Sequence, residues 1–392
     1  MSVLTLDRAT VTRARTGVFM VFAAAGFSFS SWASRLPDIK QILELTPGQL
    51  GTLLLAAAVG SVLGLPLSGR VIQAIGTRRT VLAGALASTI GIAVAGIGVG
   101  LVHSYLVTWP ALFVCGVGMG TWDVAMNHEG AEVERGLGRA IMPWFHAAFS
   151  AATVISALIG SGMTALGVPV WVHLCVSSAL VAGAVVVGVR MFLPIEDSVE
   201  ESAGASSRSA WLEPRTLLIG LVVLAAAFTE GSANDWVAVA MVEGHQLPSW
   251  LGVLGFATFL GFMTIGRIAG TSALDRFGRV PVLRALFVFA MVGSLLVVFG
   301  TPVLAFIGAA LWGIGASLGF PVGMSAAADD PARAASRLSV VSTVGYLAFL
   351  GGPPLLGYLG DHTGVLKALL AVAAFAVPAL LAVPAVREPA KS

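Results

Sequence analysis

The chain has 392 residues, of which 57% are hydrophobic and only 11% are charged, and its formal net charge is +2. Soluble domains carry about 25% charged residues, so this chain has too few charges to cover a surface that faces water. The small net charge also argues against a nucleic-acid partner. The class that fits is a multi-pass protein of a cytoplasmic (inner) membrane, embedded in the lipid bilayer.

Twelve stretches of the chain are long and apolar enough to cross a bilayer, which takes roughly 20 residues in a helix. No pattern of a cleavable signal peptide is evident in the polar, basic residues 1–17. The sequence therefore predicts an all-α membrane protein with about twelve transmembrane helices. The expected helices are 17–36, 49–70, 79–102, 106–128, 141–166, 169–192, 215–241, 249–272, 281–300, 302–325, 337–357 and 365–387.

One extended polar stretch, 193–214, divides these helices into two sets of six. It predicts a cytoplasmic linker between an N-terminal half at 1–192 and a C-terminal half at 215–392. With the N-terminus inside, all but three of the 22 lysines and arginines fall on the cytoplasmic side or at its edge. Because short cytoplasmic loops carry an excess of Lys and Arg, both termini are expected in the cytoplasm.

The two halves resemble each other at an offset of about 200 residues. The Gly-Val-Gly run that begins at Gly116 recurs as the Gly-Ile-Gly run that begins at Gly313. The segment that ends at Trp32 is echoed by the segment that ends at Trp236. Such internal repeats are common in secondary transporters, so we expect two six-helix pseudo-repeats.

The loops at 69–79 and 271–279 resemble the G-x-x-x-D-R-x-G-R-R signature of the major facilitator superfamily. The resemblance implies the major facilitator fold and a charge latch that gates the cytoplasmic side. Gln73 and Ala74 replace the acid and the base in the first copy, which weakens the expectation there. The alternative is that these charges only set topology and solvate the loops. The expected gate residues are Asp275, Arg276, Gly278, Arg279, Gly76, Arg78 and Arg79.

Residues 122–127, 129–135 and 145–150 resemble a MosC-like subgroup of this superfamily, which is distantly similar to the fucose permease. This resemblance implies a secondary transporter for a sugar, cyclitol or amino-sugar-like solute. The fourth predicted helix lacks the arginine that is typical of drug–proton antiporters, and the fifth lacks their Gly-Pro run. A proton-driven efflux antiporter for drugs or other amphipathic compounds remains the alternative.

Carboxylates inside predicted spans are the strongest functional candidates, because an ionisable group in a bilayer is costly. Asp123 and Asn127 lie four residues apart, so they share one face of the fourth predicted helix. Glu230 and Asn234 repeat this spacing in the seventh. A carboxylate in a low-dielectric site can load and release a proton during a transport cycle. We expect proton coupling at Asp123, Glu230 and His146, with His146 paired to Asp123.

Each of these residues also has a structural interpretation. Asp123 could serve only as a hydrogen-bonding group between helices. Glu230 could form an ion pair with Arg35 or cap a helix break at Gly231. His146 could be a packed histidine without a role in proton transfer.

Amide and aromatic side chains near these carboxylates would suit a hydroxylated ligand or a cation. Several of the aromatic rings could instead face lipid or neighbouring helices. No metal-ligand cluster or nucleotide-binding loop is evident, so neither an enzyme nor a cofactor is expected. The sequence predicts a monomeric, proton-coupled transporter that works by alternating access, with a small-molecule substrate and protons as partners. The expected substrate contacts are Asn127, Asn234, Trp32, Trp122, Trp144, Trp236 and Phe320.

Overall fold

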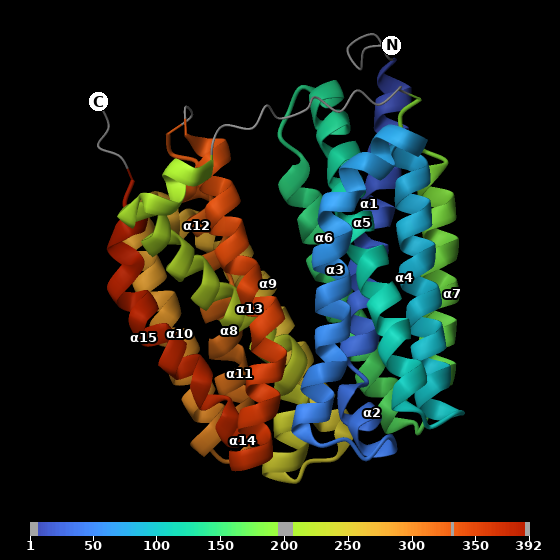
Figure 1. The fold of residues 1–392 in the computed structure, drawn as a ribbon, viewed down its shortest axis with the longest axis vertical. Coiled ribbons are helices and arrows are strands. Elements are labelled where there is room, and N and C mark those ends of the chain that lie inside the picture. The colour runs from blue at the N-terminus through green and yellow to red at the C-terminus, as the bar shows by residue number, and fades with distance from the viewer. Residues whose placement is uncertain (1–6, 195–206, 331–332, 389–392) are drawn as a thin grey trace. The chain divides into compact units, whose positions relative to one another are not determined.

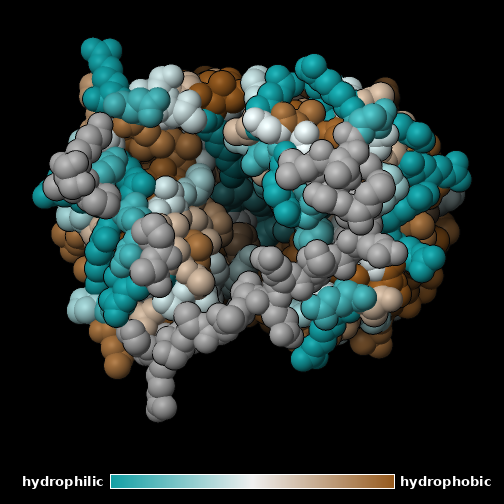
Figure 2. All heavy atoms as spheres, turned by 90° about the horizontal axis from the view of Figure 1, so that it is seen from above, coloured by the Kyte–Doolittle hydropathy of each residue, from teal (hydrophilic) through white to brown (hydrophobic). Residues whose placement is uncertain are grey.

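A computed structural model describes residues 7–194, 207–330 and 333–388, and its regular elements within these ranges are all helical (Figure 1). Twelve of the helical segments are long and apolar enough to cross a membrane. A view onto one end of the helices shows hydrophilic side chains gathered there and hydrophobic side chains along the flanks (Figure 2). The prediction of an all-α membrane protein with about twelve spans is confirmed.

The first compact unit comprises Met1–Leu45 and Leu53–Glu201. Its core is built from aromatic side chains that pack among alanines and valines, with Phe22, Trp122 and Phe145 fully buried. Small residues between the large rings let the helices approach one another closely. Its helices are α1 (Arg8–Ala33), α2 (Leu36–Ile42), most of α3 (Pro47–Ile75), α4 (Thr77–Gly100), α5 (Tyr105–Leu137), α6 (Met142–Ala165) and α7 (Val170–Val189).

The second unit comprises Thr46–Thr52 and Ser202–Ser392. Most of the predicted linker, 195–206, lies outside the described residues, and its end forms the short 3₁₀ helix η2 (Ser207–Leu212). The other elements are α8 (Pro214–His245), α9 (Ser249–Phe277), α10 (Arg279–Phe299), α11 (Pro302–Ala316), α12 (Gly319–Ala327), α13 (Ala334–Thr363), α14 (Val365–Ala368), α15 (Leu370–Ala382) and η3 (Val383–Val386).

Several helices extend beyond the apolar stretches that predict them. Helix α1 begins at Arg8 rather than at 17, because the side chain of Asp7 accepts a hydrogen bond from the backbone N–H of Thr10 and caps the helix. Helix α5 continues to Leu137 rather than 128. Hydropathy detects only the part of a helix that suits lipid, so polar helix ends escape it.

The tenth predicted span is broken into α11 and α12. The break lies after Ala316, and Ser317 turns its hydroxyl back to donate to the carbonyl of Ile314 at 2.7 Å. A serine that bonds its own helix competes with the regular ladder and bends the chain. The backbone carbonyl of Ser317 is therefore available to another helix.

Packing at matching glycines shows the duplicated construction of the two units. A Cβ atom at Gly116 of α5 would lie only 2.9 Å from the backbone nitrogen of Ser61 on α3. A Cβ atom at Gly313 of α11 would lie 3.0 Å from the backbone nitrogen of Met263 on α9. Each unit therefore seats its fourth helix against its second at a glycine that leaves no room for a side chain.

The signature glycines Gly76 and Gly278 occupy the same place in each unit. They separate α3 from α4 and α9 from α10, with φ angles of 82° and 76°. Side chains with a Cβ rarely adopt this left-handed conformation, so glycine is required at both turns. This explains why the two loops share a glycine although Gln73 departs from the rest of the signature.

Candidate transport site

Asp123 lies on α5 with its side chain accessible at the surface, beside the fully buried Trp122. The Nδ2 of Asn127 donates to the Asp123 carboxylate at 3.3 Å and to its backbone carbonyl at 2.8 Å. In the described ranges no Lys, Arg or His is paired with this carboxylate. An ionised carboxylate within a span and without a cation carries a free-energy cost that protonation would remove.

Glu230 lies on α8 in a different environment. Its Oε1 accepts a hydrogen bond from Nη2 of Arg267 on α9 at 2.9 Å, and the two side chains form an ion pair. The Nε of Arg267 donates to the carbonyl of Ser317, at the break between α11 and α12, at 3.3 Å. The guanidinium group is thus held from two sides beside the carboxylate.

Arg267 is a site residue that the sequence analysis did not identify. It was counted only among the basic residues that set topology. The sequence feature that could have identified it is its place inside the predicted helix 249–272, where a charged side chain is as costly as at Asp123. Its partner could not be inferred, because the ion pair joins residues 37 positions apart on different helices.

Arg35, the other partner considered for Glu230, is bound within the first unit. Its side chain is 3% exposed and forms an ion pair with Asp38 at 3.0 Å. Its Nη2 also donates to the carbonyl of Val168 at 2.7 Å. These bonds join the start of α2 to the turn between α6 and α7, so Arg35 has a structural role, and Glu230 pairs with Arg267 instead.

The predicted aromatic contacts differ widely in exposure. Trp122 and Trp236 are both fully buried, and their indole N–H groups have no partner among the described atoms. Trp32 is also buried, whereas Phe320 is half-buried and Trp144 is 68% exposed. Trp122 and Trp236 therefore pack inside their units, and the other three rings are more accessible to varying degrees.

The amide and the histidine predicted near the two carboxylates are placed as follows. Asn234 is half-buried one turn after Glu230, and its Oδ1 has no hydrogen-bond partner in the part of the chain that the structure describes. His146 is exposed and stands edge-on to Phe22, with ring centroids 5.1 Å apart. The contacts of Asp123 are with Asn127, so an Asp123–His146 pair stays a prediction.

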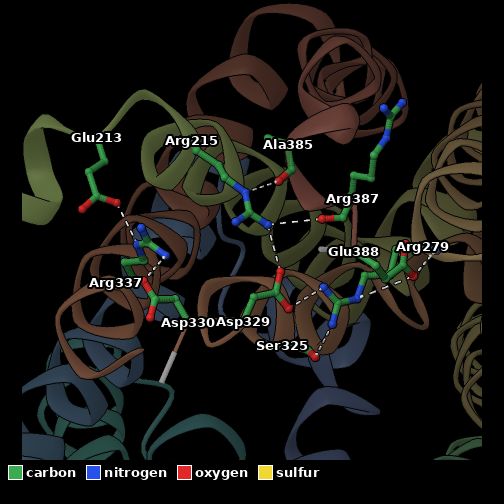
Figure 3. Close-up of polar contacts among 10 residues, drawn as sticks. All are labelled: Glu213, Arg215, Arg279, Ser325, Asp329, Asp330, Arg337, Ala385, Arg387 and Glu388. Carbon is green, nitrogen blue, oxygen red and sulfur yellow. Dashed lines mark hydrogen bonds and ion pairs between the residues drawn. The ribbon is translucent and has the colours of Figure 1, made fainter. Parts of the chain in front are cut away.

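The second signature loop places Arg279 in a network at one end of the second unit (Figure 3). Its Nη1 pairs with Asp329 at 2.8 Å, and its backbone N–H donates to Glu388 at 2.8 Å. Arg215 at the start of α8 pairs with the other oxygen of Asp329, also at 2.8 Å. Arg279 therefore connects α10 to the segment before α13 and to the C-terminal segment, all within one unit.

The remaining signature residues make fewer contacts. Asp275 and Arg276 are exposed, and the Arg276 guanidinium lies over the ring of Phe277 at 5.1 Å from its centroid. Arg78 and Arg79 of the first copy are also exposed. Their role in a gate stays a prediction.

Glu213 forms a second part of this network, just outside the span of α8. Its carboxylate pairs with Arg333 and Arg337 at 2.7 Å each and accepts a hydrogen bond from Thr216 at 2.9 Å. Burial raises the pKa of Glu213, but the hydrogen bonds from Arg337 and Thr216 and the two arginine charges outweigh it. The net pKa therefore lies below the usual 4.5.

Two glutamates of the MosC-like stretch hold backbone groups. One oxygen of Glu134 accepts from the N–H groups of Ile141 and Met142 at 2.7 Å each, at the start of α6. Glu129 is buried and accepts from the N–H of Leu193 at 2.7 Å. These carboxylates cap and join helix ends, which is a structural contribution to that stretch.

Comparison with known proteins places this architecture in a family. No protein-family model matches the chain. It is 30% identical over 361 residues to an uncharacterised MFS-type transporter of Yersinia pestis, covering 90% of this chain and 91% of that protein. The chain belongs to the major facilitator superfamily. This transporter is also 26% identical over 370 residues to the membrane protein MosC of Rhizobium meliloti, covering 92% and 87% of the two chains.

A third relative is an uncharacterised transporter, y4wD, of Sinorhizobium fredii, which is 29% identical over 374 residues and matches 95% of this chain and 98% of its own. The predicted resemblance to MosC-like members of the superfamily is confirmed. Since two of these three relatives are named as transporters and the chain belongs to this superfamily, this protein is a transporter and not an enzyme.

Solved structures share the fold at low sequence identity. The nucleoside transporter NupG has a TM-score of 0.74 and 14% identity, covering 96% of this chain and 98% of its own. A variant of the E. coli fucose:proton symporter FucP has a TM-score of 0.65 and 15% identity, covering 95% and 98%. These likenesses establish the major facilitator fold of this transporter.

Proposed function

We propose that this transporter moves a small, polar, hydroxylated solute across the cytoplasmic membrane by alternating access coupled to protons. In this proposal both termini lie in the cytoplasm, and the protein acts as a monomer. The observation that carries the coupling is the environment of Asp123, whose carboxylate has the neutral Asn127 as its hydrogen-bond partner. Proton binding would remove its charge and lower the cost of closing the site around it.

Glu230 contributes to substrate binding rather than to proton transfer. Its Oε1 is already engaged by Nη2 of Arg267 at 2.9 Å, in an ion pair. In this proposal the first unit supplies the coupling carboxylate, Asp123. The second unit supplies an ion pair without net charge, Glu230 with Arg267. Trp32, Phe320 and Asn127 are the further substrate contacts that this proposal retains.

The sugar-like class of solute is supported by similarity. FucP is a fucose:proton symporter by name, and NupG is a nucleoside transporter. Both ligands carry a sugar ring with several hydroxyl groups. The network around Arg279 would then belong to the cytoplasmic gate, where it would keep the end of the second unit rigid as access alternates.

Uptake into proteoliposomes with an imposed pH gradient tests the coupling. Candidate solutes are radiolabelled L-fucose, D-glucose, myo-inositol and glucosamine, after a thermal-shift screen, since a ligand stabilises the folded state. For one proton per solute, two pH units can drive about a 100-fold accumulation. We expect Asp123→Asn to equilibrate the solute without accumulating it.

The matched control is Asp7→Asn, which makes the same chemical change outside the described spans and keeps an N-cap residue. It should accumulate the solute as the unmodified protein does. Full accumulation by Asp123→Asn would contradict the proposal. Proton-driven release of ethidium, without uptake of any sugar, would favour the efflux antiporter instead.

A further inference from the structure

We propose that Glu230 and Arg267 together bind two adjacent hydroxyl groups, a vicinal diol, of an uncharged ligand through hydrogen bonds. This inference rests on the proposed function and narrows its substrate class to neutral sugars and cyclitols. It assigns a specificity-determining role to Arg267, and it excludes amino sugars, which carry a positive charge.

The ion pair leaves hydrogen-bonding capacity on both partners. Arg267 uses Nη2 for Glu230 and Nε for the carbonyl of Ser317, and its guanidinium group carries more N–H donors than these two bonds use. Glu230 uses only Oε1 among the described contacts, and a carboxylate can accept several hydrogen bonds. A ligand thus meets spare donors and spare acceptors side by side.

Both side chains are accessible and fixed in place. Glu230 is 21% exposed and Arg267 is 32% exposed, so a ligand can reach them without breaking the pair. The hydrogen bond from the Nε of Arg267 to the carbonyl of Ser317, at the break between α11 and α12, fixes the orientation of the guanidinium group. A preorganised pair loses little side-chain entropy when a ligand binds.

Adjacent hydroxyls match this arrangement of donors and acceptors. Each hydroxyl both donates and accepts, so one can donate to the Glu230 carboxylate while its neighbour accepts from the Arg267 guanidinium. Oε1 and Nη2 bond each other at 2.9 Å, so the carboxylate and the guanidinium present their remaining acceptors and donors next to each other. A single hydroxyl has one proton to donate, so it fills fewer of the spare donors and acceptors of the pair than two adjacent hydroxyls do.

Charge favours a neutral ligand over a charged one. The two charges of the pair cancel, and Asn234, one turn further along α8, is uncharged. A ligand carboxylate would gain Arg267 but be repelled by Glu230, and a ligand ammonium would gain Glu230 but be repelled by Arg267. A neutral diol satisfies both partners without repulsion.

The repeat supports a role for this pair beyond holding helices together. At the offsets of Trp32 with Trp236 and of Gly76 with Gly278, the matching residues of the first unit are Gly26 and Leu65. Gly26 packs instead against α6, where a Cβ atom would lie 3.1 Å from the Cα atom of Phe149. The ion pair is therefore not repeated at the matching positions of the first unit.

Ligand-induced thermal shifts of the purified full-length transporter test the inference. The probes are trans-1,2-cyclohexanediol, compared with trans-1,3-cyclohexanediol and cyclohexanol, and D-glucose, compared with glucosamine and gluconate. We expect the 1,2-diol to bind about tenfold or more tightly than the 1,3-diol or the single alcohol, since these leave a polar group unpaired. Glucosamine and gluconate should bind more weakly than glucose.

The decisive variant is Glu230→Gln combined with Arg267→Gln, which removes both charges and leaves two side chains of similar shape that can still bond each other. It should stay folded, with an unchanged elution profile, and lose the preference for the 1,2-diol. Arg284→Gln is the control, because Arg284 is exposed on α10 in the same unit. This control should keep the full discrimination.

Retained discrimination in the double variant, tighter binding of a charged sugar, or binding of no diol at all would overturn the inference. If discrimination follows Glu230 and Arg267 but a pH gradient drives no uptake, the proposed function fails and the diol site stands. If proton-driven uptake persists but its selectivity ignores the pair, the diol site fails and the proposed function stands.

Discussion

Asp123 and Glu230 are the same motif placed in two different electrostatic settings. Each carboxylate is followed four residues later by an asparagine on the same helix. In the first unit Asn127 bonds back to Asp123, and in the second Arg267 pairs with Glu230, while the Oδ1 of Asn234 lacks a hydrogen-bond partner among the described residues. The chemistry of each pair is therefore set by a neighbouring helix rather than by the motif itself.

The two units agree in packing and differ in charge. Gly116 and Gly313 seat equivalent helices against each other, and Gly76 and Gly278 form equivalent left-handed turns. The charged side chains have no such counterparts, since the position that matches Asp123 is Phe320. A duplicated scaffold can thus hold two different sites, one suited to a proton and one to a polar ligand.

The largest effect is expected where the units agree. Gly116→Val and Gly313→Val would each drive a side chain into the backbone of a facing helix, at a cost of about 3 kcal/mol, the upper end for overpacking. Neither variant should yield folded transporter by size-exclusion chromatography in detergent. The controls are Gly183→Val and Gly261→Val, where a Cβ meets open space. Normal folding of one glycine variant alone would show that the two units are packed differently.

A smaller effect on stability is expected at Glu213, whose carboxylate forms ion pairs with Arg333 and Arg337. Because its pKa is lowered in the folded state, Glu213 stabilises that state above the usual pKa of 4.5. The stabilisation is lost as the pH falls through the lowered folded-state pKa. We expect Glu213→Gln to lower the melting temperature by about 1–2 °C at pH 7.

This difference between Glu213→Gln and the unmodified protein should shrink as the pH is lowered below 4.5, and scanning calorimetry at several pH values would measure it. Glu44→Gln, at an exposed position, should leave the melting temperature unchanged at every pH. A difference that grows towards low pH would contradict the sign of the Glu213 shift.

The sequence was sufficient to predict the spans, the repeat and the superfamily. A bilayer demands long apolar helices, and a left-handed turn demands glycine, so both leave marks in the chain. Arg267 could not be assigned, since its ion pair depends on how α8 and α9 face each other. The burial of Trp122 and Trp236 could not be predicted either. An aromatic residue in an apolar helix can face lipid, a cavity or the protein core, and the sequence does not distinguish these places.

The division of roles between Asp123 and Glu230 can be measured directly. Infrared difference spectra recorded while the pH is changed report which carboxyl groups take up a proton. Asp235, a further carboxylate on α8, is unchanged in the variants below, so subtracting the spectra of two variants removes its contribution.

We expect a protonated-carboxyl band in the unmodified transporter that disappears in Asp123→Asn and persists in Glu230→Gln. A band that persists in Asp123→Asn and disappears in Glu230→Gln would contradict the account.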